Sequence, residues 1–128
     1  MAELTGTTLL GRYHVEAFVA RGGMADVYRG FDKQRQVRVA LKFMRPDFAL
    51  DREFERRFRR EAATLEKLSH PNIVRYYELQ RAGDQLFMVM DFIEGVSLQR
   101  YLFEQGSTLS PGEVLAILKP LSSALQYA

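Results

Sequence analysis

Apolar and polar residues alternate along five short stretches of the chain, which is the period of strands that bury one face. In the third stretch, Val37 and Val39 alternate with Arg38 before the chain reaches Lys42. The glycine-containing segments 20–25 and 81–84 fall between stretches and are typical of turns. The pattern predicts strands at Tyr13–Val19, Asp26–Phe31, Val37–Phe43, Ile73–Gln80 and Gln85–Phe92.

A helical period predicts one long helix between the third and fourth strands. From Asp51 to Leu68, apolar residues recur at steps of three and four, and Asp51 is placed to cap the first turn. Pro71, after His70, ends the helix because proline cannot continue it. The apolar stripe is Phe54, Phe58, Ala62, Leu65 and Leu68.

Two further helices are predicted after the last strand. Leu98–Phe103 is expected to be short, whereas the second helix begins after Ser110. Ser110 and Glu113 have the spacing of a capping box. Pro120 lies inside this helix, and we expect it to bend the axis. The apolar stripe of the helix is Val114, Ile117, Leu118, Leu121 and Leu125.

Composition narrows the class of protein. The chain has 128 residues, is 47% hydrophobic and 27% charged, and carries a formal net charge of +2, which favours one folded domain over a disordered or membrane protein. It has no cysteine, which excludes disulfides and cysteine-bound zinc. Met1–Thr8 has no apolar core, so we expect no secretion signal and a cytoplasmic location. The arginine-rich run 52–60 contains Glu53 and Glu55, which favours a solvated helix face over a nucleic-acid surface.

Lys42 and Glu61 both need a partner of opposite charge. Lys42 ends an apolar strand, where an ammonium group without an anion is costly. Glu61 lies seven residues after Phe54 and seven before Leu68, which places it near the centre of the predicted apolar stripe. Lys42 is the natural cation for it, and phosphate is a second anion available to the lysine. The alternative is that Glu61 lies at a groove edge and reaches water.

The glycine-rich segment 20–25 joins one predicted strand to another. Dinucleotide-binding and P-loop motifs need a strand, a glycine turn and then a helix, so both are excluded. At a hairpin tip, Gly22 and Gly23 admit positive φ and let backbone N–H groups approach a phosphate closely. The alternative is an ordinary glycine hairpin with no ligand.

Taken in order, these features resemble the N-terminal half of a protein kinase domain, and most closely the bacterial eukaryotic-like Ser/Thr protein kinases. The resemblance extends over Tyr13–Ala128. It implies an α+β fold, in which a leader at 1–12 precedes a small lobe at 13–93, a five-stranded antiparallel sheet with an αC helix. Residues 94–128 would form the hinge exit and the first helices, αD and αE, of a truncated large lobe. The segments that carry the resemblance are Arg21–Tyr28 (glycine-rich loop), Val39–Lys42 (strand lysine), Phe58–Ala62 (αC glutamate), His70–Val74 (the turn after αC) and Met90–Gly95 (hinge).

The resemblance also implies an ATP site. Lys42 would contact the α- and β-phosphates and pair with Glu61, so that the pair doubles as an activity switch, while the glycine loop would cover the phosphates. Met90 would be the gatekeeper, and Ser97 would reach the ribose. Val27 and Ala40 would pack on the adenine faces, and the backbones of Asp91 and Ile93 would bind its edge. The implied set is Val19, Ala20, Arg21, Gly22, Gly23, Val27, Ala40, Lys42, Glu61, Met90, Asp91, Ile93 and Ser97.

The sequence departs from the family pattern in two ways. Ala20 and Ala25 stand where the family loop has its first and third glycines, and we expect them to weaken nucleotide binding. The His-Arg-Asp catalytic loop, the metal-binding Asn and the Asp-Phe-Gly motif do not occur in the chain. The catalytic Asp and the Mg²⁺ ligands are therefore expected beyond Ala128, and the chain alone is expected to be inactive.

The leading interpretation is the N-terminal portion of an ATP- and Mg²⁺-dependent kinase that phosphorylates Ser and Thr hydroxyls of protein substrates, with any membrane anchor downstream. A second interpretation is a non-catalytic, pseudokinase-like nucleotide-binding or interaction module. A third is an unrelated α+β domain in which Lys42 and Glu61 form a structural ion pair. The residues that follow Ala128 would separate the first two. The rest of a large lobe would cover the apolar stripe of the last helix, and this chain does not contain it. We therefore also expect self-association through that helix.

Overall fold

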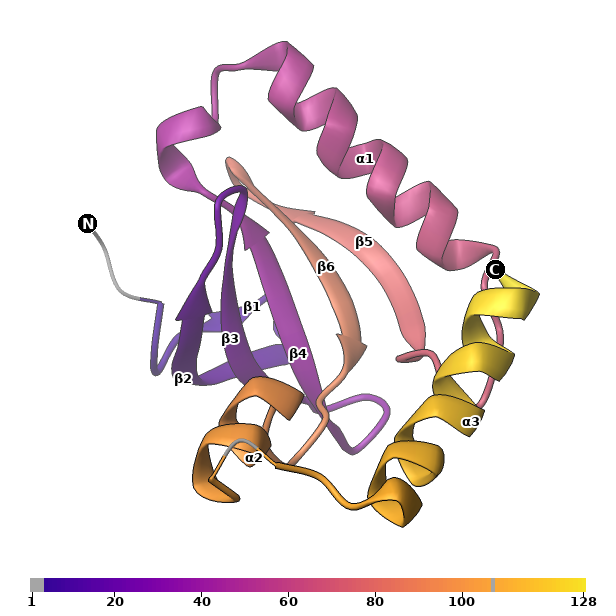
Figure 1. Ribbon diagram of the computed structural model, residues 1–128. Coiled ribbons are helices and arrows are strands. Elements are labelled where there is room, and N and C mark those ends of the chain that lie inside the picture. The colour runs from indigo at the N-terminus through magenta and orange to yellow at the C-terminus, as the bar shows by residue number, and fades with distance from the viewer. Residues whose placement is uncertain (1–3, 107) are drawn as a thin grey trace. The chain divides into compact units, whose positions relative to one another are not determined.

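The computed structural model describes residues 4–106 and 108–128, which form two compact units (Figure 1). The first unit comprises the described part of residues 1–68 together with Arg75–Phe92. The second comprises Ser69–Val74 and the described part of residues 93–128. This division differs from the sequence-based boundary at residue 93 because it assigns the segment 69–74 and Ile93 to the second unit.

The first unit is built on one antiparallel sheet with the strand order β1-β2-β3-β4-β6-β5. The sheet has six strands, not the five predicted, because Thr8–Leu9 in the predicted leader pairs with β2. The last hairpin begins at Tyr76 rather than at Ile73. The strands are β1 (Thr8–Leu9), β2 (Tyr13–Arg21), β3 (Ala25–Asp32), β4 (Val37–Met44), β5 (Tyr76–Ala82) and β6 (Gln85–Asp91).

One face of the sheet carries the main core. Alternate residues of β2, β3, β4 and β6 meet there and are almost completely buried, which is what the two-residue period of a strand produces. The Phe43 and Phe87 rings lie 4.9 Å apart between centroids, and Tyr13 meets Phe87 edge-on. Each such buried aromatic contributes on the order of 2 kcal/mol. The cluster is Tyr13, Val15, Tyr28, Val39, Leu41, Phe43, Phe87 and Val89.

Helix α1 (Arg52–Glu66) packs on part of the opposite face. Asp51 caps it as predicted, since its side chain accepts a hydrogen bond from the Phe54 N–H at 3.1 Å. A short 3₁₀ helix, η1 (Pro46–Phe48), leads from β4 towards α1. The buried contacts of α1 join Phe54, Phe58 and Ala62 to Met44, Leu86 and Met88.

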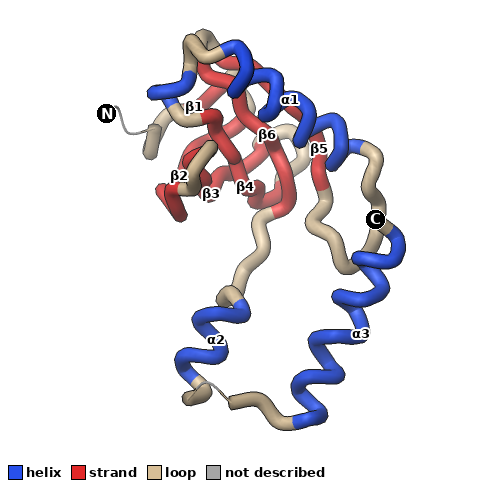
Figure 2. The backbone as a smooth tube through the Cα atoms, turned by 45° about the horizontal axis from the view of Figure 1, so that its top comes forward, coloured by secondary structure: helices blue, strands red, loops and turns tan. Residues whose placement is uncertain are grey.

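The second unit contains α2 (Leu98–Glu104) and α3 (Pro111–Tyr127), drawn in Figure 2 as two helices joined by a loop. The predicted capping box of α3 is present, with Ser110 and Glu113 exchanging hydrogen bonds of 3.0 and 3.2 Å. The Tyr101 hydroxyl of α2 also bonds to Glu113, at 2.5 Å. His70 is a turn residue as predicted, because its Nδ1 accepts from the Asn72 N–H at 3.0 Å.

Candidate functional site

Lys42 and Glu61 form a direct ion pair. The Lys42 Nζ lies 2.7 Å from Glu61 Oε1, and the pair connects β4 to the middle of α1. The predicted pairing is therefore present, with the helix in the position that closes it. The two side chains are 29% and 41% exposed. The pair is thus accessible to solvent and to a ligand.

The prediction that Glu61 lies at the centre of the buried helix face is wrong. The buried positions of α1 are Phe54, Phe58 and Ala62, and the helix ends at Glu66, so Leu68 does not belong to its stripe. At 3.6 residues per turn, Glu61 lies about 60° from the centre of the face that is actually buried. The alternative interpretation, a carboxylate at a groove edge, describes its position, and Lys42 is its partner there.

Four predicted site residues share one face of the sheet. In the register, Val27 lies opposite Lys42, and Ala40 lies opposite Met90. Directly paired residues of antiparallel strands project to the same side, as do residues two apart on one strand. All four are only partly buried, unlike the residues of the main core on the other face. This face therefore offers apolar surface beside the lysine.

The glycine-rich turn between β2 and β3 is held by charged side chains. Arg21 and Asp26, which are paired across the hairpin, form a two-bond ion pair of 2.8 and 2.9 Å. From beyond β4, Arg45 donates through its backbone N–H to the Met24 carbonyl at 3.2 Å and through its guanidinium to the Gly22 carbonyl at 3.3 Å. The Gly22 N–H donates to the Ala25 carbonyl at 2.8 Å, so this N–H serves the hairpin rather than a ligand.

Nothing within the described protein requires glycine at positions 22 and 23. Neither residue has the positive φ that the sequence suggested. A Cβ atom at Gly22 would meet only the Ala25 carbonyl at 3.4 Å, and one at Gly23 would meet nothing within 4 Å. At Gly30, in contrast, a Cβ would lie 2.6 Å from Leu41. The tip of the turn therefore has room for close approach by a group from outside, which fits a phosphate.

The remaining loop residues of the predicted site lie on β2 and β3. Val19 and Ala20 are exposed, and Ala20 pairs with Val27. Ala25, which replaces a family glycine, is buried and has no positive φ. The two alanines are therefore compatible with the hairpin itself.

The predicted hinge residues are divided between the two units. Met90 and Asp91 end β6 in the first unit, and the Asp91 N–H donates to the Arg75 carbonyl at 2.9 Å. Ile93 and Ser97 lie in the second unit, where the Ser97 hydroxyl caps α2 by accepting from the Arg100 N–H at 3.2 Å. The placement of these two residues relative to Lys42 stays a prediction.

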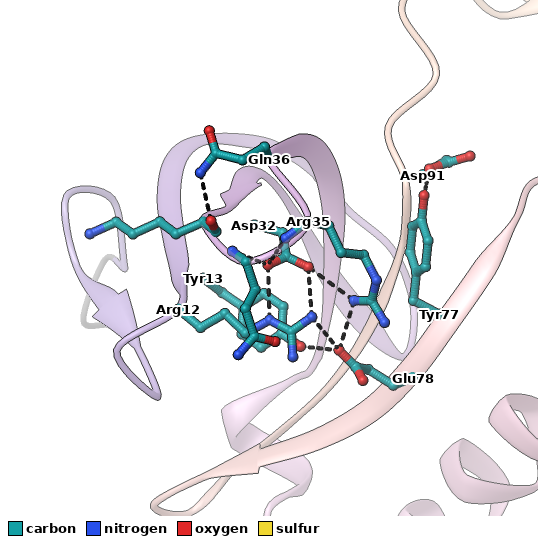
Figure 3. A network of polar contacts seen from close by, with 10 residues as sticks. Arg12, Tyr13, Asp32, Arg35, Gln36, Tyr77, Glu78 and Asp91 are labelled. Carbon is teal, nitrogen blue, oxygen red and sulfur yellow. Dashed lines mark hydrogen bonds and ion pairs between the residues drawn. The ribbon is translucent and has the colours of Figure 1, made fainter.

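Sequence reasoning missed a polar network that surrounds Asp32 at one end of the sheet (Figure 3). The carboxylate of Asp32 is fully buried and accepts two hydrogen bonds from Arg12, at 2.8 and 3.0 Å, and one from Arg35 at 2.9 Å. Arg35 also bonds to Glu78 at 3.0 Å, and the Tyr13 hydroxyl donates to Glu78. The only local signal was Asp32 at the start of a polar turn, where it also accepts from the backbone of residues 34 and 35.

The network shifts the pKa values of its members. Burial alone would raise the pKa of Asp32, but the hydrogen bonds from Arg12 and Arg35 hold it well below its usual range. The pKa of Glu78 is lowered for the same reason. Burial alone would raise it, but the hydrogen bonds from Arg35 and Tyr13 lower it. Burial, together with the bond to Glu78, raises the pKa of Tyr13 to about 12. Both carboxylates are therefore ionised at neutral pH, and the tyrosine is protonated.

Residues 4–106 and 108–128 contain neither a metal-binding cluster nor a helix that could span a membrane. Within these ranges, His, Asp and Glu side chains nowhere gather in a group of three or more that could hold a metal ion. No helix in the same ranges has the length and apolar character needed to span a bilayer.

The order of strands and helix, with a closed Lys–Glu pair beside a glycine hairpin, matches the small lobe of a protein kinase domain. The family model described as "Protein kinase domain" matches residues 13–128. The chain therefore belongs to the protein kinase family.

Individual relatives support this assignment. The chain is 42% identical over 125 residues to the serine/threonine-protein kinase PrkC of Bacillus subtilis, covering 98% of this chain and 19% of that protein. It is 38% identical over 125 residues to PknL of Mycobacterium tuberculosis, covering 98% of this chain and 31% of that protein. Among solved structures, the Mycobacterium tuberculosis PknI kinase domain matches with a TM-score of 0.79 and 32% identity, over 98% of this chain and 50% of that one. The chain thus spans less than a third of these two curated relatives and about half of a kinase domain.

Proposed function

We propose that this chain is the nucleotide-binding N-terminal portion of an ATP-dependent Ser/Thr protein kinase. The observation that carries the proposal is the closed Lys42–Glu61 pair on the same partly open face as Val27, Ala40 and Met90. In a chain of the kinase family, this arrangement fits a nucleotide whose phosphates approach the lysine. The parent enzyme would transfer the γ-phosphate to Ser and Thr hydroxyls of protein substrates.

Lys42 is suited to bind phosphate while it remains paired. An ammonium group has three N–H donors, and Glu61 takes one of them at 2.7 Å, so donors remain for a phosphate. Glu61 fixes the direction of the lysine, and the space at Gly22 and Gly23 admits the phosphates from the side of the hairpin. When ATP is bound it supplies the phosphoryl group, while these residues bind and orient it.

The remaining contacts concern the base and sugar. Val27 and Ala40 offer apolar surface to the two faces of the adenine, and Met90 limits the depth of the site. The backbones of Asp91 and Ile93 bind the adenine edge, and Ser97 reaches the ribose. Val19, Ala20 and Arg21 complete the loop side of the site.

Catalysis in this proposal depends on sequence that follows Ala128. The catalytic Asp and the Mg²⁺ ligands would come from there, since the chain has none of the motifs that supply them. The chain alone is expected to bind nucleotide without transferring phosphate. We place this portion in the cytoplasm, where ATP and protein substrates are available, and expect no nucleic-acid partner.

A titration of the 128-residue chain with ATP, followed by NMR chemical shifts, tests the proposal. We expect shifts at Val27, Ala40 and Lys42, and an affinity about tenfold weaker in Lys42→Met, since charge-assisted hydrogen bonds are lost. The matched control, Lys33→Met, removes an exposed lysine from the β3–β4 turn and should bind like the wild type. Shifts scattered over both faces of the sheet, or equal affinity in Lys42→Met, would contradict the proposal.

We also propose that the chain associates with itself through the exposed apolar stripe of α3. The predicted stripe is largely exposed, with Leu121 at 47% and Leu125 at 68%, among the described residues of the second unit. A groove of about 410 Å³ lies beside it, lined by Val96, Leu98, Tyr101, Glu113, Ala116 and Ile117. Exposed apolar surface of this kind favours contact with another protein surface.

Sedimentation velocity at micromolar concentrations tests this association. We expect a concentration-dependent dimer that Leu121→Glu weakens, whereas Gln126→Glu, an exposed polar position near the end of the same helix, has little effect. A monomer at all concentrations would refute self-association without affecting nucleotide binding.

A further inference from the structure

Strand β5 contains an irregularity at Tyr77. Tyr76 pairs with Met90 of β6, but Glu78 pairs with Val89, so two steps along β5 correspond to one step along β6. This is a β-bulge with Tyr77 as the extra residue. Bulges are common next to functional sites because they redirect a side chain.

The bulge changes the face to which Tyr77 projects. Tyr76 packs in the cluster beneath α1, as expected from its pairing with Met90. Regular alternation would then return Glu78 to that same face, yet both Tyr77 and Glu78 lie on the main-core side. There the Tyr77 hydroxyl donates a hydrogen bond to the carboxylate of Asp91, the last residue of β6 (Figure 3).

Two arginines contact the ring of Tyr77. The guanidinium carbon of Arg35 lies 4.4 Å from its centroid, and that of Arg75 lies 4.7 Å away. Arg35 is itself fixed by its bonds to Asp32 and Glu78, at 2.9 and 3.0 Å. Burial and the bond to Asp91 raise the pKa of Tyr77, so the hydroxyl remains protonated and can donate at neutral pH.

Asp91 is consequently fixed through two different groups. Its carboxylate accepts from Tyr77, and its backbone N–H donates to the Arg75 carbonyl at 2.9 Å. Asp91 follows Met90, which faces the other side of the sheet with Ala40 and Lys42. The Tyr77 contact therefore acts from behind the strand on the backbone that the proposed adenine site uses.

We infer that Tyr77 is a positioning residue that orders the adenine-binding end of β6 through its hydrogen bond to the Asp91 carboxylate. The inference rests on the proposed nucleotide function. Tyr77 does not touch the nucleotide. It reduces the ordering that the strand end must undergo when the base binds, and so strengthens binding of the base but not of the phosphates.

Affinities of the 128-residue chain for adenosine, ATP and inorganic tripolyphosphate, measured by NMR titration, test this inference. Tyr77→Phe removes the hydroxyl and keeps the ring with its contacts to Arg35 and Arg75. We expect adenosine and ATP to bind about fivefold more weakly to it, with tripolyphosphate unchanged. Tyr76→Phe, the neighbouring tyrosine on the other face, is the matched control and should bind all three probes like the wild type.

A double-mutant cycle separates loss of the shared hydrogen bond from any other effect of Tyr77→Phe. In the Asp91→Ala background, Tyr77→Phe should cause no further loss of adenosine affinity, since the shared hydrogen bond is already absent. Unchanged adenosine affinity in Tyr77→Phe, or an equal loss for tripolyphosphate, would overturn the inference while leaving the proposed function intact. Failure of the wild-type chain to bind either adenosine or ATP would instead overturn the proposed function and this inference with it.

Discussion

The molecule contains two ionic sites whose construction differs. At one end of the sheet, the fully buried Asp32 carboxylate is bonded by Arg12 and Arg35, and Glu78 extends the network to β5. On the other face, Lys42 meets Glu61 through one short contact, and both side chains are substantially exposed. The first is a closed network of several bonds, whereas the second is a single pair that solvent can reach.

The difference in burial indicates that the Asp32 network serves the stability of the fold, whereas the Lys42–Glu61 pair is available to a ligand. A buried carboxylate stays ionised only while its cationic partners remain, so the Asp32 network must persist for the fold to persist. A half-exposed pair contributes little to stability, and it can be opened or shared with a third group at small cost. The exposure of Lys42 and Glu61 is therefore compatible with the proposed nucleotide site, in which the lysine would accept a phosphate.

The largest effect is expected from removing the centre of the buried network. Asp32→Ala leaves two guanidinium groups without their carboxylate and removes the acceptor for the turn backbone, so the free energy of unfolding should fall by about 3 kcal/mol. Urea denaturation followed by circular dichroism measures it. Asp84→Ala, at an exposed position in the β5–β6 turn, is the control and should change stability by about 0.5 kcal/mol or less. Similar losses in the two variants would show that the network is not a special source of stability.

A smaller effect should appear as a dependence of stability on pH. The folded-state pKa values of Asp32 and Glu78 lie below their unfolded values of about 3.9 and 4.3, so the stabilisation is complete above those values. As the pH falls below about 4, the unfolded chain takes up protons first, and the free energy of unfolding decreases.

Urea denaturation between about pH 5 and pH 3 measures this dependence. In Asp32→Asn the decrease should be shallower, because one of the titrating carboxylates is gone. The same comparison with Asp84→Asn provides the control. Parallel pH profiles for the wild type and Asp32→Asn would contradict the assignment of the shift to Asp32.

The parts of the fold that depend on local sequence were predictable. Asp51 and the Ser110–Glu113 box cap their helices as expected, since a cap involves residues only three apart. The Lys42–Glu61 pair was also predicted, from the strand that ends at Lys42 and from the family resemblance, although the helix periodicity placed Glu61 too close to the centre of the buried face. The exposure of the pair could not be predicted, because it depends on where α1 ends. The helix ends at Glu66, so Leu68 does not belong to its buried face.

The Asp32 network and the bulge at Tyr77 could not be predicted, for a different reason. Tyr13 and Glu78 are 65 positions apart, and their contact exists only because β2 and β5 are folded into one sheet. Alternation of apolar residues also assumes an unbroken strand, so a bulge is invisible to it. Both features depend on strand register, which a single sequence specifies only weakly.

The smallest effect on the free energy of unfolding is expected from a substitution in the Lys42–Glu61 pair, where the effect on ATP binding should be largest. Glu61→Gln removes the charge of the Lys42 partner at a position that is 41% exposed, so the free energy of unfolding should change by less than about 1 kcal/mol. ATP affinity should nevertheless fall, because Lys42 loses the group that directs it towards the phosphates. Urea denaturation and ATP titration of the same sample measure both quantities, with Glu66→Gln at the exposed end of α1 as the control. A loss of stability comparable to that of Asp32→Ala would mean that Lys42 and Glu61 form a structural ion pair, and the distinction between the two ionic sites would fail.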